Sequence, residues 1–247
     1  MPFRFFSRRR FSSDASLPVV LIMAHNESAY LPKTLRLLWD SRLPIRVVVV
    51  DDGSSDGTSR IATKWGAEVV SLSKNRGKAS AFFAGLKAIS RATPLPPCVI
   101  TLDADMVHLP PHDLQKLIFS AGAATRKGVS LMDVAGVTEM RVDVFRRRKR
   151  VDAVLPRISS GIRSFSIPAV FHLVSSRHKS LAKGFGLERF LEYFFSSDRT
   201  KKRLEATFVS HPAFRKGQRL QASEVELTSR RLGQLHRSVS HRRRLRG

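Results

Sequence analysis

Four short apolar segments rich in β-branched residues set the strongest constraint on how this chain can fold. They cover residues 17–23, 45–50, 67–72 and 99–102. The intervening residues 30–39, 58–65 and 77–90 carry apolar side chains at helical spacing. Continuously apolar strands that alternate with helices indicate an α/β fold, in which a mostly parallel sheet is covered by helices on both faces.

Three of the predicted strands end at carboxylates. Glu27 follows the first strand, Asp51 and Asp52 follow the second, and Asp103 and Asp105 follow the fourth. Because parallel strands present their carboxyl ends at one edge, where such sheets bind ligands, we expect these side chains to lie close together. Carboxylate pairs suit Mg²⁺ or Mn²⁺, which can bridge a diphosphate. We therefore expect a divalent cation at Asp103 and Asp105.

Several classes of protein are disfavoured by what the sequence lacks. It has neither the G-x-G-x-x-G loop after the first strand nor a G-x-x-x-x-G-K-[ST] loop, so a dinucleotide-binding or P-loop site is not expected. The single cysteine, Cys98, excludes an intramolecular disulfide framework and a cysteine-based zinc cluster. The apolar runs are far shorter than the roughly 20 residues of a membrane-spanning helix.

Positive charge is concentrated in the second half of the chain. The 247 residues include 44 Lys and Arg against 20 Asp and Glu, a net charge of +24. Residues 1–16 contribute +3, residues 17–115 contribute +2, and the remaining 132 residues contribute +19. The densest basic run covers residues 146–150. An anionic partner is therefore expected: nucleic acid, a phospholipid surface or a phosphorylated substrate.

Four motifs, in this order and spacing, resemble glycosyltransferase family two, which has the GT-A fold with a Rossmann-like sheet. They are VVLIMAHNESAYLPKTL from residue 19, VVVVDDGSSDGTSRIA from residue 47, NRGKASAFFAGL from residue 75 and VITLDADMVHLPP from residue 99. Further on, ISSGIRSFS at 158–166 resembles the S-G-F-R segment of polyprenyl-phosphate sugar transferases of the dolichol-phosphate mannose synthase type. GFGLERFLEYF at 184–194 is similar to the G-x-G-x-E helix of many members.

The resemblance implies a nucleotide-binding role for the first two motifs. Glu27 would hold the ribose or the base of the nucleotide. Asp51 and Asp52 would contact the base, with Val50 packing beside it. The alternative for Asp51 and Asp52 is a turn in which their side chains only satisfy backbone donors.

The resemblance implies a diphosphate site and a phosphate site for the later motifs. Asp103 and Asp105 would hold the metal and, through it, the donor diphosphate, with the backbone of Ala104 nearby. Lys78 would lie near the diphosphate, and Arg163 would bind the phosphate of the donor or acceptor. Asp105 and Arg163 are the expected catalytic residues. Because prolines at 156 and 168 bracket the segment around Arg163, we expect it to be a shaped loop.

The function implied is metal-dependent, inverting transfer of a sugar from a nucleotide donor to a polyprenyl phosphate at a membrane surface. A soluble hydroxyl acceptor is the enzymatic alternative and needs a general base. Glu188 is a candidate for that base, or else a surface glutamate paired with Arg189. A nucleic-acid-binding protein on a degenerate transferase scaffold is disfavoured, because it would not need Asp103 and Asp105.

The expected organisation has three parts. Residues 1–16 form a basic mobile arm, whose composition is also compatible with a transit peptide. Residues 17–211 form the catalytic domain, with a nucleotide-sugar and metal half at 17–115 and an acceptor half at 116–211. Residues 212–247 form a basic C-terminal helix and tail that suits an anionic membrane surface. We expect a cytoplasmic protein, peripheral on the cytoplasmic face of a membrane.

Overall fold

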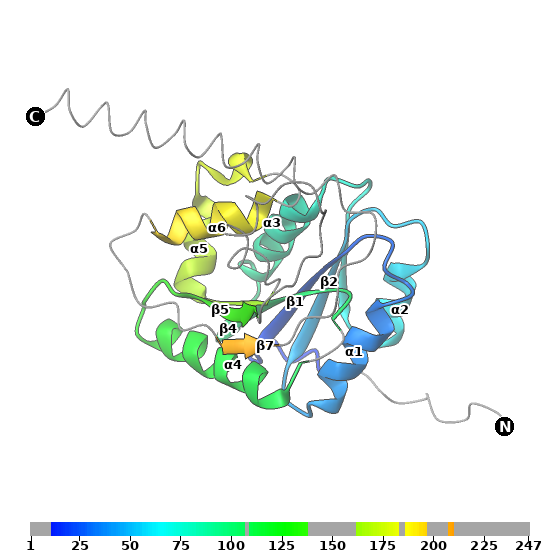
Figure 1. Ribbon diagram of the computed structural model, residues 1–247, viewed down its shortest axis with the longest axis horizontal. Helices are drawn as coiled ribbons and strands as arrows, with labels where there is room; N and C mark the ends of the chain where they lie inside the picture. The colour runs from blue at the N-terminus through cyan, green and yellow to red at the C-terminus, as the bar shows by residue number, and fades with distance from the viewer. Residues whose placement is uncertain (1–10, 107–108, 138–161, 183–185, 197–206, 210–247) are drawn as a thin grey trace, which may run out of the picture.

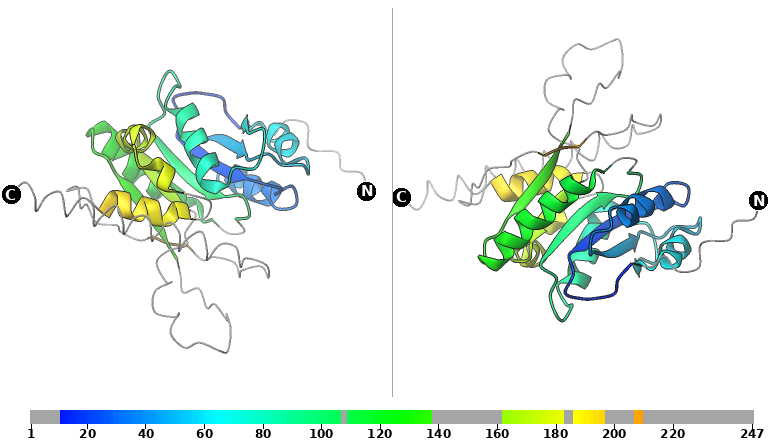
Figure 2. Two further views of the ribbon diagram at one scale, coloured as in Figure 1. Left: turned by 90° about the horizontal axis from the view of Figure 1, so that it is seen from above. Right: turned by 90° about the horizontal axis from the view of Figure 1, so that it is seen from below.

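The computed structural model describes residues 11–106, 109–137, 162–182, 186–196 and 207–209. These residues form a central sheet between two layers of helices (Figure 1), so the predicted α/β fold is confirmed. Figure 2 shows the two layers from opposite sides, with the yellow α6 on one face and the blue α1 and green α4 on the other.

The sheet has seven strands among the described residues, in the order β3-β2-β1-β4-β6-β5-β7. The strands are β1 (Val19–Ala24), β2 (Arg46–Asp51), β3 (Glu68–Ser71), β4 (Cys98–Asp103), β5 (Met132–Val137), β6 (Arg163–Ser166) and β7 (Thr207–Val209). The first four are parallel to one another. β6 runs antiparallel to both β4 and β5, and β7 is parallel to β5. The sheet is thus mostly parallel, as predicted.

Each face of the sheet is covered by three α-helices among the described residues. One core lies under α1 (Leu31–Asp40), α2 (Thr58–Lys64) and α4 (Pro111–Arg126). The other lies under α3 (Lys78–Ile89), α5 (Ile167–Ser175) and α6 (Leu187–Ser196), with a short 3₁₀ turn, η1 (Lys179–Leu181), between α5 and α6. The predicted strands and helices of the first half are confirmed to within two residues at each end.

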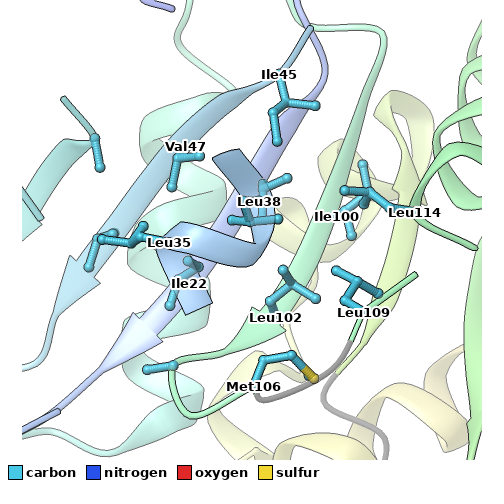
Figure 3. Close-up of a cluster of buried hydrophobic side chains, with 14 of the residues drawn as sticks. Ile22, Leu35, Leu38, Ile45, Val47, Ile100, Leu102, Met106, Leu109 and Leu114 are labelled. Carbon is cyan, nitrogen blue, oxygen red and sulfur yellow. The ribbon is translucent and has the colours of Figure 1, made fainter. Parts of the chain in front are cut away.

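Strand alternation divides the apolar side chains between the two cores. On β1, Ile22 faces α1, whereas Leu21 faces α3. Figure 3 shows the first of these cores, where Leu35 and Leu38 of α1 lie over the sheet. Met106, which follows β4, is also buried in this core, 1% exposed. The loop after β4 is therefore anchored by its own apolar side chains.

The structure corrects the expectation of a loop around Arg163. Residues 163–166 form strand β6, which is fully enclosed between β4 and β5. Pairing with strands far away in the sequence determines this conformation, and local composition does not reveal it. Pro168 falls in the first turn of α5, where its missing N–H costs no hydrogen bond.

The expected boundary of the N-terminal arm at Ser16 is also too late. Phe11 is buried, its N–H donates to the carbonyl oxygen of Trp65 at 3.2 Å, and its ring packs edge-on against Trp39 at 5.9 Å between centroids. The basic residues 1–10 lie outside the described residues.

Gly85 allows α3 to lie close to the sheet, and this contact generates a stability prediction. A Cβ atom at Gly85 would lie 2.5 Å from Leu21 Cδ1 and 2.9 Å from Val50 Cγ2. Gly85→Ala should therefore lower the free energy of unfolding by about 1–3 kcal/mol, measured by urea denaturation. The matched control is Gly122→Ala in α4, where the nearest heavy atom would be Arg126 Nη1 at 3.7 Å. This control should be neutral or slightly stabilising, and equal effects of the two substitutions would contradict the packing account.

Candidate active site

The predicted carboxylates do meet at one edge of the sheet. In the parallel register, Ala24 of β1 lies beside Asp51 of β2, and Met23 lies beside Asp103 of β4. Glu27 follows in the loop after β1. The ends of three adjacent strands therefore bring the acidic motifs to the same level of the same edge.

The loop after β1 is fastened to the loop after β2 by hydrogen bonds between backbone and side chains. The Asn26 N–H donates to Ser54 Oγ at 2.9 Å, and Asn26 Oδ1 accepts from the N–H of Ser55 at 2.9 Å. The Glu27 N–H donates to Thr58 Oγ1 at 3.0 Å. These contacts fix the backbone of Glu27 at the edge.

Asp51 and Asp52 both use their carboxylates to hold neighbouring backbone. Asp51 accepts from the Ser54 N–H at 3.0 Å and from the Ser59 hydroxyl. Asp52, only 3% exposed, accepts from the N–H groups of Arg76 and Gly77 at 2.8 and 2.7 Å. Asp52 therefore fixes the loop that leads into α3.

Gly53 and Val50 explain how tightly this edge is packed. Gly53 has a φ of +71°, and a Cβ atom there would lie 2.5 Å from the backbone carbon of Lys74. Val50 has no exposed surface and belongs to the core beneath α3. Its side chain is thus a core side chain, which corrects the expectation that it packs beside a nucleotide.

The loop after β4 carries the Asp103-Ala104-Asp105 motif. Asp103 is the last residue of β4, Ala104 is buried, and Asp105 is partly exposed. Thr34, fully buried on α1, donates its hydroxyl to the carbonyl oxygen of Ala104 at 2.7 Å. Thr34 thus positions the motif, although its only sequence signal is a polar residue on the apolar face of a helix.

An ion chain links this motif to two helices. The Lys78 Nζ atom lies 2.8 Å from Asp103 Oδ1 and 2.7 Å from Glu188 Oε1. Burial alone would lower the pKa of Lys78, but the Asp103 and Glu188 carboxylates outweigh it and raise that pKa above its usual range. Lys78 is therefore a fixed positive charge at the edge. Glu188, whose side chain is 10% exposed, is not the surface glutamate of the alternative interpretation.

Arg163 lies on the same face of the sheet as this ion chain. It pairs with Thr101 in the antiparallel register, two residues before Asp103. Val99 and Phe165 pair two residues further along and point into the core beneath α3, α5 and α6. By strand alternation the side chain of Arg163 points to that face as well, and the residue is only 2% exposed.

Asp103 and Asp105 fit a hard divalent cation in their chemistry. No group of three His, Cys, Asp or Glu side chains that could enclose a metal occurs in the described ranges. The protein therefore offers two carboxylates, and both are partly exposed at the strand end. Mg²⁺ is commonly bound in this way, by one or two carboxylates together with substrate phosphates and water.

The structure thus gathers the predicted site residues around one edge, except Val50, which lies in the core beneath it. The residues at the edge are Glu27, Asp51, Asp52, Lys78, Asp103, Ala104, Asp105 and Arg163. The basic run at 146–150 and the residues from 210 onward lie outside the described residues. No helix in the described part of the chain is long and apolar enough to cross a membrane.

Comparison with known proteins identifies the family. The model for Glycosyl transferase family 2 matches residues 19–173. This range includes every motif named above except GFGLERFLEYF at 184–194, which contains Glu188. The chain belongs to this family.

Curated relatives match about two fifths of the chain. Protein MJ1222 of Methanocaldococcus jannaschii is 38% identical over 99 residues, which are 40% of this chain and 39% of the relative. The undecaprenyl-phosphate 4-deoxy-4-formamido-L-arabinose transferase of Serratia proteamaculans is 32% identical over 109 residues, 40% of this chain and 32% of the relative. The chain thus spans about a third to two fifths of the length of these relatives.

Solved structures confirm the GT-A fold. Glucosyl-3-phosphoglycerate synthase from Mycobacterium tuberculosis, in complex with Mg²⁺ and uridine diphosphate, aligns with a TM-score of 0.58 at 21% identity. The alignment covers 88% of this chain and 79% of that one. Mannosyl-3-phosphoglycerate synthase from Rubrobacter xylanophilus gives a TM-score of 0.56 at 18% identity, over 90% of this chain and 75% of that one.

The anchoring role of Asp52 generates a prediction about the loop before α3. Asp52→Ala leaves the N–H groups of Arg76 and Gly77 without their acceptor, which should cost about 1–3 kcal/mol of stability. Hydrogen–deuterium exchange in residues 73–78 should become faster. Asp40→Ala, which removes an exposed ion pair with Arg36 on α1, should leave this exchange unchanged. Unchanged exchange in Asp52→Ala would contradict the anchoring role.

Asp56 generates a prediction about pH. Burial opposes the shift, but hydrogen bonds from Thr58 and Ser28 lower the pKa of Asp56 from its usual 3.8 to about 2. A lowered pKa in the folded state stabilises the protein above about pH 4, and this contribution is lost as the pH falls toward 2. The stability difference between wild type and Asp56→Asn should therefore shrink over this range, measured by thermal unfolding. A difference that stays constant with pH would contradict the assignment.

Proposed function

We propose that this protein is a glycosyltransferase that moves a sugar from a nucleotide-sugar donor to a phosphate-bearing acceptor, a polyprenyl phosphate at a membrane surface. The observation that carries the proposal is the pairing of carboxylates with cations at one edge. Asp103 of the Asp103-Ala104-Asp105 motif is paired with Lys78, and the buried Arg163 lies on the same face. Such an edge suits two phosphate groups, one on each substrate.

The donor half of the site would hold the nucleotide diphosphate. The nucleoside would lie at the edge beside Glu27, Asp51 and Asp52. Hydrogen bonds hold the loops that carry these residues in place. Asp103 and Asp105 would hold Mg²⁺ or Mn²⁺, whose charge neutralises the leaving diphosphate. Lys78 adds a fixed positive charge next to Asp103.

The reaction is a single displacement at the anomeric carbon. An oxygen of the acceptor phosphate forms the new bond to this carbon, and the bond to the donor phosphate oxygen breaks. The nucleoside diphosphate leaves with the electron pair, and the configuration of the sugar is inverted. A phosphate acceptor is already an anion, so it needs no general base, and Arg163 would orient it by its guanidinium group.

The undecaprenyl-phosphate transferase relative supports a polyprenyl-phosphate acceptor. A membrane-surface location, on the cytoplasmic face, is in keeping with the net charge of +19 in the last 132 residues.

A soluble phosphorylated acceptor is the second candidate. The structural neighbours include a glucosyl-3-phosphoglycerate synthase in complex with uridine-diphosphate-glucose and phosphoglyceric acid. A phosphoglycerate would have to accept the sugar on a hydroxyl group, and such a transfer would need a general base. Glu188 is the candidate base suggested by the sequence, but its Oε1 atom lies 2.7 Å from Lys78 Nζ. Because Glu188 is already paired with Lys78, we favour the polyprenyl phosphate, which needs no general base.

A transfer assay separates the two acceptors. The full chain is incubated with Mn²⁺ and a panel of radiolabelled nucleotide sugars, with either undecaprenyl phosphate in detergent or 3-phosphoglycerate. We expect label to enter the organic phase with undecaprenyl phosphate. Label found only in the aqueous product would favour the soluble acceptor, and no transfer to either would contradict the proposal.

The carboxylate pair supplies the variant for this assay. Asp105→Asn should lower the transfer rate by about a hundredfold or more, because it weakens the charge stabilisation of the leaving group. Asp40→Asn, an aspartate on the surface of α1, should retain wild-type transfer. An unaffected rate in Asp105→Asn would contradict the metal mechanism.

A further inference from the structure

The ion chain at the edge contains one feature that sugar transfer itself does not explain. A single ammonium group, Lys78 Nζ, is shared by two carboxylates from segments far apart in sequence, Asp103 on β4 and Glu188 on α6. All three side chains are largely buried, with 17%, 23% and 10% of their surface exposed. The charges therefore interact with little screening by solvent.

The backbone of Lys78 is fixed independently of this chain. Asp52 holds the N–H groups of Arg76 and Gly77, and Gly77 has a φ of +85° that favours glycine. The close approach of Gly85 to Leu21 then presses the rest of α3 onto the sheet. The position of the ammonium group thus depends on how the flexible Lys78 side chain divides its contacts between the two carboxylates.

The packing of α6 against α3 holds the backbone of Glu188 in place. It lies in the first turn of α6, between Leu187 at 2% exposure and Phe190 at 0%. The Phe190 ring packs against Phe83 of α3 at 6.0 Å between centroids. Glu188 therefore sits at a set place next to α3, and its carboxylate competes with Asp103 for Lys78.

We propose that Glu188 is a positioning residue for the cation site: by sharing Lys78, it keeps this ammonium group from neutralising Asp103 and so leaves Asp103 able to bind a divalent cation. This inference rests on the proposed function, in which Asp103 and Asp105 hold the metal. Of the two carboxylates that share Lys78, only Asp103 remains when Glu188 is removed. The acceptor-side helix α6 thereby sets the affinity of the donor side for its metal.

The inference predicts opposite effects for two variants of the same ion chain. Glu188→Gln directs Lys78 onto Asp103 and should weaken Mn²⁺ binding by about tenfold. Lys78→Met removes the competing cation and should strengthen Mn²⁺ binding by about tenfold. A purely structural role of the ion chain would weaken binding in both variants.

The test is a titration of the full chain with MnCl₂ alone, in which electron paramagnetic resonance measures free Mn²⁺. The matched controls are Glu68→Gln, which breaks an ion pair with Arg46 far from the carboxyl edge, and Lys87→Met, an exposed lysine near the end of α3. Both should bind Mn²⁺ as wild type does. Thermal unfolding of each variant verifies that it is folded, and Glu188→Gln against Glu68→Gln decides the matter if Lys78→Met does not fold.

Each outcome has a definite meaning. Opposite shifts support the inference, and they do so even if the transfer assay fails, in which case only the proposed reaction is refuted. Shifts in the same direction, or no shift in either variant, overturn the inference while leaving sugar transfer untouched. Absence of Mn²⁺ binding by wild type and both variants overturns the inference together with the metal requirement of the proposed function.

Discussion

The parallel pairing of β1 with β2 and β4 is the constraint on which the candidate site depends. Its register places Ala24 beside Asp51 and Met23 beside Asp103. A shift of one residue in either pairing would turn alternate side chains to the opposite face and separate the acidic motifs. The register is secured by the two apolar cores, because β1 is buried on both faces and cannot slip without exposing one set of side chains to the wrong helices.

At the ends of these strands, polar side chains hold the backbone of the loops in place. Asp52 holds the loop before α3, Asp51 holds the turn after β2, and Thr34 holds the backbone of Ala104 from the opposite face. Each contact satisfies a backbone group that would otherwise be costly to bury. The same contacts place Lys78 at the start of α3, so that the rigid loops and the ion chain form one connected unit. The proposed sugar transfer gains from such preorganisation, because the charges that would stabilise the leaving diphosphate need not rearrange during the reaction.

The sequence predicted the first hundred residues well, because local pattern and motif agree there. Continuous runs such as residues 45–50 identify buried strands, and parallel strands place their following carboxylates at one edge. The contacts that needed three dimensions were not predictable. Glu188 and Lys78 are far apart in the chain, and nothing in the periodicity of either segment links them. Residues 163–166 form a strand only because β4 and β5 enclose them, and Val50 is close to the edge in sequence but belongs to the core.

We propose that the carboxyl edge binds a nucleoside diphosphate through a divalent cation at Asp103 and Asp105. Ligand binding to the folded state raises the unfolding temperature, so thermal shift of the full chain measures this directly. We predict that uridine or guanosine diphosphate raises the unfolding temperature by several degrees with Mn²⁺ or Mg²⁺ present, and that EDTA abolishes the rise. An equal rise in EDTA, or no rise with any nucleoside diphosphate, would contradict the account.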